Sequence, residues 1–201
     1  MRYLIVFAFL FVAPSAFAQY VVRNGGYVVS CRNQAPLALE VAEAQAQNLT
    51  MDYSPARSFQ VKVADLISRI RAVNPEKALK YTRWLQQWPE QVRWHGRFEL
   101  TGPNDQGTIK LRAGCRMRIA IVQTNESRFG VQEYAIDSLL WQALNEDQKA
   151  ALVMHEFIYR DVLEENPDSN SSWVRHVNTL VHSLDFQYRD RRAFTALIDS
   201  L

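Results

Sequence analysis

Two adjacent side chains near the C-terminal end of the sequence are of the types that carry out hydrolysis. His155 and Glu156 lie in the middle of "NEDQKAALVMHEFIYRDVLEENP", a segment with the composition of a helix. A His-Glu pair in mid-helix begins the active-site motif of zinc peptidases. In that motif a second histidine four residues later binds the same metal, and the glutamate acts as general base for a zinc-bound water. The pair therefore raises the hypothesis of a metal-dependent hydrolase.

The motif is incomplete, because Tyr159 stands where the second histidine is needed and Arg160 adds a positive charge beside it. A remote ligand, His176, His182 or Glu165, would have to complete the site after the following loop. The preceding segment "VQEYAID" also resembles the edge strand on which zincins hold a peptide. The candidate catalytic residues are His155 and Glu156, and the candidate metal ligands are His155, His176 and His182.

The same residues have a structural explanation. His155 shares an apolar helix face with Ala151 and Ile158, which is typical of a core histidine that is hydrogen-bonded and neutral. Glu156 and Arg160 have the spacing and order of a favourable i,i+4 pair. We expect Arg175 from the next helix to join them, so that Glu156, Arg160 and Arg175 form a structural network between two helices. On this interpretation no cofactor is needed.

The N-terminus predicts export. "MRYLIVFAFLFVAPSAFAQY" has one positive residue, a short apolar run, a break at Pro14 and the triplet Ala16-Phe17-Ala18. This is the pattern of a secretory signal peptide. We expect residues 1–18 to be removed and residues 19–201 to form a single domain in the periplasm or outside the cell. No later segment is apolar and long enough to span a bilayer, so we expect no transmembrane segment after cleavage.

The two cysteines are expected to form a disulfide. Cys31 and Cys115 are the only cysteines, and both end apolar segments. An exported chain meets an oxidising compartment, and neither cysteine has a nearby histidine or second cysteine that would suggest a metal site. A bridge that closes so long a ring contributes about 4–5 kcal/mol on chain-entropy arithmetic. The alternative is a pair of buried free thiols.

The charge balance excludes one class of partner. The chain has 23 basic and 21 acidic residues, interspersed along the sequence. Nucleic-acid binding needs a basic stripe, which is absent here, so we expect no nucleic-acid partner.

The partners that remain are an envelope protein or a wall component. The principal hypothesis is a non-enzymatic binding or structural domain, the alternative is a zincin-like hydrolase or a degenerate relative, and the sequence alone does not decide whether the protein is an enzyme.

Hydrophobic periodicity predicts an α+β fold. Helical spacing recurs over "SFQVKVADLISRIRAVN" and "EKALKYTRWLQQW", the second ending at Pro89, and alanines and glutamates favour a helix over "LALEVAEAQAQ". Alternation or short apolar runs predict strands over "YVVSC", "VRWHGRFEL", "RMRIAIVQT" and "VQEYAI". The C-terminal third is helical. We therefore expect a small, mostly antiparallel sheet packed with several helices.

Three motifs together resemble a known family. They are "NGG" with "VVSC" after a signal peptide, the helix with His155, Glu156, Tyr159 and Arg160, and the segment "NSSWVRHVN" from Asn170 to Asn178. The combination is similar to a family of small exported proteins of predatory, Bdellovibrio-type bacteria. One departure is "LALEVAEA" after Cys31, where members often have Leu-Leu-Asp-x-Tyr-Glu; this chain keeps Glu43 but lacks the aromatic residue. The resemblance implies export and architecture, and it implies no reaction.

Overall fold

The structure is a computed structural model that describes residues 25–96, 99–101, 111, 113–126, 131–167, 169 and 171–201. The expected signal peptide lies outside the described residues. The expected α+β fold is confirmed, with a helical C-terminal region. The described helices are α1 (Leu39–Ala46), α2 (Phe59–Arg71), α3 (Pro75–Gln91), α4 (Ser138–Ala143), α5 (Glu146–Glu165), α6 (Ser171–Val181), α7 (Leu184–Arg189) and α8 (Arg191–Asp199). The described strands are β1 (Tyr27–Cys31), β2 (Leu37–Ala38), β3 (Val92–His95), β4 (Cys115–Ile119), β5 (Ile121–Glu126) and β6 (Val131–Asp137).

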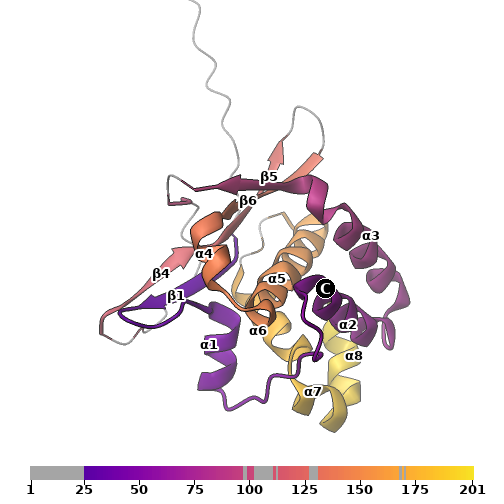
Figure 1. The fold of residues 1–201 in the computed structure, drawn as a ribbon. Coiled ribbons are helices and arrows are strands. Elements are labelled where there is room, and N and C mark those ends of the chain that lie inside the picture. The colour runs from indigo at the N-terminus through magenta and orange to yellow at the C-terminus, as the bar shows by residue number, and fades with distance from the viewer. Residues whose placement is uncertain are drawn as a thin grey trace, which may run out of the picture.

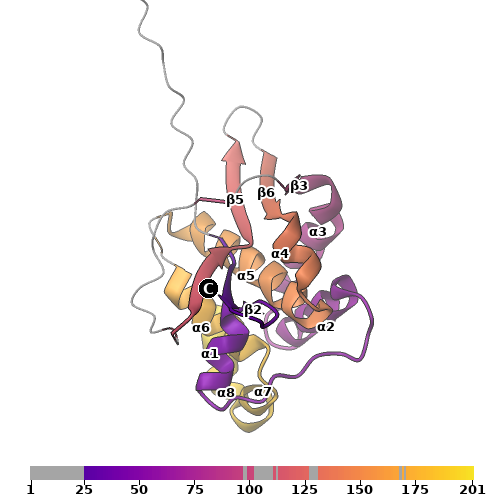
Figure 2. The ribbon, with the colours of Figure 1, turned by 60° about the vertical axis from the view of Figure 1, so that its left-hand side comes forward.

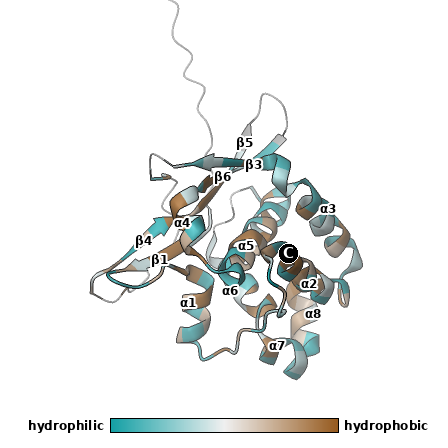
Figure 3. Cartoon of the chain, viewed as in Figure 1, coloured by the Kyte–Doolittle hydropathy of each residue, from teal (hydrophilic) through white to brown (hydrophobic). Residues whose placement is uncertain are grey.

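Helix α5 is the centre of the molecule, with α2, α3 and α6 around it and the sheets at one end (Figure 1). It starts at Asn145, whose side chain accepts the Gln148 amide as an N-cap. Most of its residues from Ala150 to Leu163 are buried, including His155 and Glu156. Figure 3 shows how apolar residues concentrate on the inward sides of the surrounding helices. A helix that is buried nearly all round is a core element, so polar groups on α5 need partners inside the protein.

Two small sheets stand in place of the single expected sheet. In the first, β1 pairs in antiparallel fashion with β2 on one side and β4 on the other. In the second, β6 lies between β3, which is parallel to it, and β5, which is antiparallel. Figure 2 shows β6 next to β5, with β3 on its other side, apart from the short strand β2.

The segment "RMRIAIVQT" was expected to be one strand, and the structure divides it. Ala120 separates β4 from β5, and each half belongs to a different sheet. The Ala120 amide donates to the Gly26 carbonyl, and its own carbonyl accepts from the Asp137 amide, so this residue links both sheets. The apolar character of both faces therefore reflects a crossing between sheets.

Two further details differ from expectation. Helix α3 continues through Pro89 to Gln91, with the proline inside its last turn. Strand β6, which contains "VQEYAI", is the middle strand of its sheet, so β3 and β5 occupy both of its edges. The expectation that this strand offers a free edge to a peptide is therefore wrong.

The expected disulfide is present. Cys31 and Cys115 are bridged, and they are also register partners at the end of the β1–β4 pair. The bridge thus closes the tip of a two-stranded ribbon across a sequence separation of 84 residues. Among the described helices, none combines the length and apolarity that a membrane span requires.

Candidate functional site

The two glycines of the "NGG" motif bring the backbone of the N-terminal segment against the core. A Cβ on Gly25 would lie 1.6 Å from the carbonyl oxygen of Ile121. A Cβ on Gly26 would lie 2.7 Å from Leu152 Cδ2 and 3.3 Å from the carboxylate of Glu156. Gly25 is therefore required by the close backbone of β5, and a Cβ at Gly26 would displace the Leu152 side chain of α5. Packing against β5 therefore explains Gly25, and packing against the helix that carries the His-Glu pair explains Gly26.

The close approach gives Glu156 its partner. The Gly26 amide donates to Glu156 Oε1 at 2.6 Å, between groups 130 residues apart. Glu156 is fully buried, and its second oxygen, Oε2, has no hydrogen-bond partner among the described residues. Its backbone carbonyl accepts from the Gln123 side chain at 3.0 Å. One carboxylate oxygen is thus satisfied and the other is left bare in the core.

His155 meets a carboxylate from α1. Its Nδ1 lies 2.5 Å from Glu40 Oε1, and both side chains are essentially inaccessible to solvent. The two atoms are close enough for an ion pair, but their angles do not meet hydrogen-bond geometry. The other ring nitrogen, His155 Nε2, has no hydrogen-bond partner in the described part of the chain. We call Glu40, His155 and Glu156 the buried acid–histidine cluster.

Burial and mutual charge shift the protonation of this cluster. Burial raises the pKa of Glu156 to about 7, opposed by the positive charge of His155 and the Gly26 amide and reinforced by Glu40. Burial alone would lower the pKa of His155, but the carboxylate of Glu40 outweighs it and raises that pKa above its ordinary value. Two carboxylates therefore flank one imidazole, with at least one proton held among them at neutral pH.

The predicted network of Glu156, Arg160 and Arg175 does not form as expected. Arg160 donates to Glu164 at 3.3 Å and its guanidinium lies 4.2 Å from the centre of the Trp84 ring. Arg175 donates to Glu43 at 3.2 Å and to Ser171 at 2.8 Å. Glu156 turns inward to Gly26, because the glycine approach places a backbone donor closer than either guanidinium.

The candidate metal ligands lie in three different environments. His155 is in the cluster, and His176 is exposed on α6 beside the Trp173 ring. His182 is buried, with Nε2 at 3.1 Å from Asn178 Oδ1, and burial lowers its pKa to about 3. Within the described residues no three His, Cys, Asp or Glu side chains are grouped as a metal site would need. None of the three histidines is assigned here as a metal ligand.

Neither family models, curated proteins nor solved structures gave a match to this chain. The candidate site therefore rests on its own residues.

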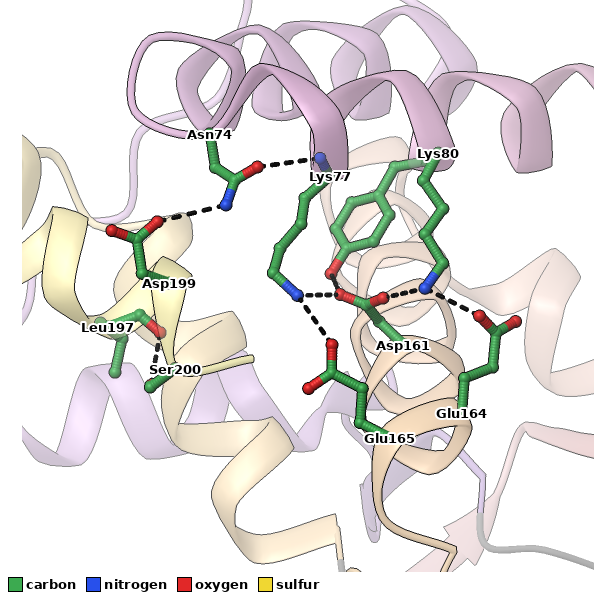
Figure 4. Close-up of polar contacts among 10 residues, drawn as sticks. Asn74, Lys77, Lys80, Asp161, Glu164, Glu165, Leu197, Asp199 and Ser200 are labelled. Carbon is green, nitrogen blue, oxygen red and sulfur yellow. Dashed lines mark hydrogen bonds and ion pairs between the residues drawn. The ribbon is translucent and has the colours of Figure 1, made fainter.

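A second buried carboxylate, on the same helix, behaves differently. Asp161 is inaccessible, yet both of its oxygens are occupied: Lys80 pairs with Oδ1, while Lys77 and the Tyr81 hydroxyl donate to Oδ2 at 3.0 and 2.9 Å. Figure 4 shows Lys77 and Lys80 reaching from α3 to Asp161. The same lysines also pair with Glu165 and Glu164. This network joins α3 to α5 and occupies both oxygens of Asp161 with donors from α3, so it is structural.

The aromatic residues of α3 fill the core. Trp84 and Trp88 are buried against Phe157, and Trp88 also lies 4.5 Å from the Tyr134 ring centre. Trp94 is close to Trp84 and Trp88 in sequence but is largely exposed, so the three tryptophans do not form one aromatic surface.

A groove opens beside the disulfide, between α1 and the β1–β4 ribbon, which lie next to each other in Figure 1. We call it the disulfide groove; its volume is about 560 Å³. Its aliphatic lining consists of Val29, Leu37, Leu39, Ala42, Ala46, Leu111 and Ala113. Arg32 and Glu43 are its charged lining residues. The carboxylate of Glu43 is paired with Arg175, whereas Arg32 is exposed and forms no ion pair within the described residues.

Sequence reasoning missed Glu40 and the disulfide groove. Glu40 is one glutamate of an alanine-rich helix, and nothing in its spacing distinguishes it from a solvated residue. The groove depends on the position of α1 against the ribbon, which is a tertiary arrangement. The nearest available signal was the disulfide expectation, since the bridge forms part of the groove wall.

Proposed function

We propose that this protein is an exported, non-enzymatic binding domain that takes an extended peptide segment of another envelope protein in the disulfide groove. The observation that carries the proposal is the contrast in access. His155 and Glu156 are 1% and 0% exposed, whereas the disulfide groove reaches the surface through the exposed residues Gln45 and Ala46. A general base must come within hydrogen-bond reach of its substrate. Because His155 and Glu156 are closed off from solvent, the structure favours a binding function over hydrolysis at this pair.

The lining of the groove favours a peptide. Ligand sites combine apolar walls with a few polar groups that fix orientation. Here the lining combines aliphatic side chains with the amides of Gln34 and Gln45, which can donate to and accept from peptide groups. At the rim, Arg32 is a guanidinium whose charge is not balanced by a described carboxylate. The matching occupant is an aliphatic peptide with a carboxylate at the end that meets Arg32.

The test is a selection on the disulfide-bonded protein. Phage-displayed random heptapeptides should yield binders with aliphatic residues and one acidic group, and a synthetic copy of the best binder should bind in calorimetry. Ala42→Trp fills the groove and should abolish binding. Leu79→Trp, at an exposed position of α3, is the matched control and should bind normally.

Two results would overturn the proposal. One is that no peptide is selected, or that the selected peptide binds Ala42→Trp unchanged. The other is that the protein cleaves a peptide library and loses that activity in His155→Ala, which would support the hydrolase in its place.

A further inference from the structure

Both walls of the disulfide groove contact the same two consecutive residues of α5, His155 and Glu156. One wall is α1, whose Glu40 meets His155 at 2.5 Å. The other wall is β1, whose preceding residue Gly26 donates to Glu156 at 2.6 Å. His155 and Glu156 are consecutive residues of one rigid, buried helix. A change of charge on this pair therefore acts on both walls together.

The charges around the pair are unevenly balanced. Facing it are Glu40 and Glu43 from α1, Arg175 from α6, Tyr134 from β6, and Arg160 on α5 itself. Strand β5 contributes the neutral Gln123, and β1 contributes the Gly26 amide. Glu43 and Arg175 balance each other, and Arg160 is engaged by Glu164. With Glu156 protonated, Glu40 and an imidazolium at His155 also balance. When Glu156 is ionised, one buried negative charge remains without a partner.

The disulfide groove brings water to Glu43, which is an electrostatic neighbour of this cluster. Glu43 lines the groove with its side chain 27% exposed, and its electrostatic neighbours include Glu40 and His155. An aliphatic ligand that fills the groove removes water from this side of α1. Removing water raises the cost of a buried charge, so a filled groove favours the form in which Glu156 holds its proton.

We propose that ligand binding in the disulfide groove is linked to proton uptake by the buried acid–histidine cluster, so that the groove binds its peptide more tightly at acidic than at alkaline pH. This inference rests on the proposed function for its ligand. Linkage is reciprocal: protonation of the cluster raises the affinity for the peptide by the same factor by which bound peptide raises the affinity of the cluster for the proton. Typical couplings lead us to expect a peptide affinity on the order of tenfold higher at about pH 5.5 than at about pH 8.5.

The first measurement uses the free wild-type protein and needs no ligand. Glutamate side-chain carboxyl carbons are followed by NMR across the same pH range, together with backbone amides. The amides of Val29 and Ala42, one in each wall, should titrate with the midpoint of Glu156. The amide of Leu79, on α3 away from the groove, should not follow it. Groove amides that ignore the Glu156 midpoint would overturn the linkage.

The second measurement uses the selected heptapeptide and the variant Glu156→Gln. Wild-type affinity should fall toward alkaline pH, and the variant should bind with pH-independent affinity. Saturating peptide should raise the Glu156 midpoint by about one pH unit for a tenfold coupling. Peptide binding that needs the groove but is constant with pH overturns the linkage and leaves the proposed function standing. Absence of peptide binding at every pH overturns the proposed function, and the free-protein titration then decides the linkage alone.

Discussion

Replacing Glu156 by glutamine should stabilise the protein at alkaline pH, and the size of the effect can be worked out from the structure. Glu156 is fully buried, and burial raises its pKa from 4.5 to about 7. Each tenfold change in acidity corresponds to about 1.4 kcal/mol. The shift of the Glu156 pKa from 4.5 to about 7 therefore corresponds to about 3 kcal/mol of native-state stability that is lost when the buried carboxyl ionises.

The sign follows from proton counts. Between pH 4.5 and about 7 the unfolded chain releases the Glu156 proton while the folded protein keeps it. The folded state binds more protons in this window, so the free energy of unfolding falls as pH rises. Below the window the carboxyl is neutral in both states. In Glu156→Gln the side chain cannot ionise, so the free energy of unfolding does not fall through this group as pH rises.

The assay is urea unfolding of the oxidised protein followed by tryptophan fluorescence, at about pH 5 and about pH 8.5. The stability of Glu156→Gln relative to wild type should rise by about 3 kcal/mol between the two pH values. Glu90→Gln, at an exposed position near the end of α3, is the matched control and should show no such rise. A variant that is destabilised equally at both pH values would refute the reasoning, because Glu156 would then be ionised without cost.

Four other outcomes follow from the same contacts. Asp161→Ala leaves two lysines and a tyrosine hydroxyl short of a buried partner and should cost about 3–5 kcal/mol in urea unfolding, whereas Glu164→Ala, at a partly exposed position, should cost about 1 kcal/mol or less. Gly26→Ala places a Cβ against Leu152 and should cost about 1–3 kcal/mol; equal stability to wild type would contradict the close approach of β1 to α5. Reduction of the disulfide should lower the free energy of unfolding by about 2–5 kcal/mol, measured with and without reductant. Because burial lowers the pKa of His182 to about 3, stability should fall as pH drops from about 6.5 toward 3, and His182→Asn should lessen that fall; an imidazole NMR midpoint near the ordinary value would count against it.

Much of the local structure could be predicted from the sequence because it depends on neighbouring residues. Asn74 before Pro75 predicts the start of α3, and its side chain does accept the Lys77 amide there. Asn145 with Gln148 predicts the start of α5 in the same way. The pairing of Cys31 with Cys115 was also predictable, since two cysteines in an expected exported chain have one possible partner each.

Strand placement was less predictable, because a strand's edges are filled by residues far away in sequence. Strand β6 alternates as an edge strand might, and only the positions of β3 and β5 make it central. Likewise the apolar run around Ala120 does not distinguish one central strand from two strands in different sheets. Hydrophobic pattern reports burial, and it does not report which neighbour provides it.

The sequence by itself determined that His155 and Glu156 are neighbours on a helix, with His155 on its apolar face and without the second histidine of a zinc peptidase. Only the tertiary structure decided their partners. The i,i+4 rule made Arg160 the expected partner of Glu156, but two glycines more than a hundred residues away bring a backbone amide closer. Glu40 reaches His155 from a helix that gives no sign of it in sequence. The physical reason is that a buried charge takes whichever partner the packing delivers within hydrogen-bond distance, and packing is set by the whole chain.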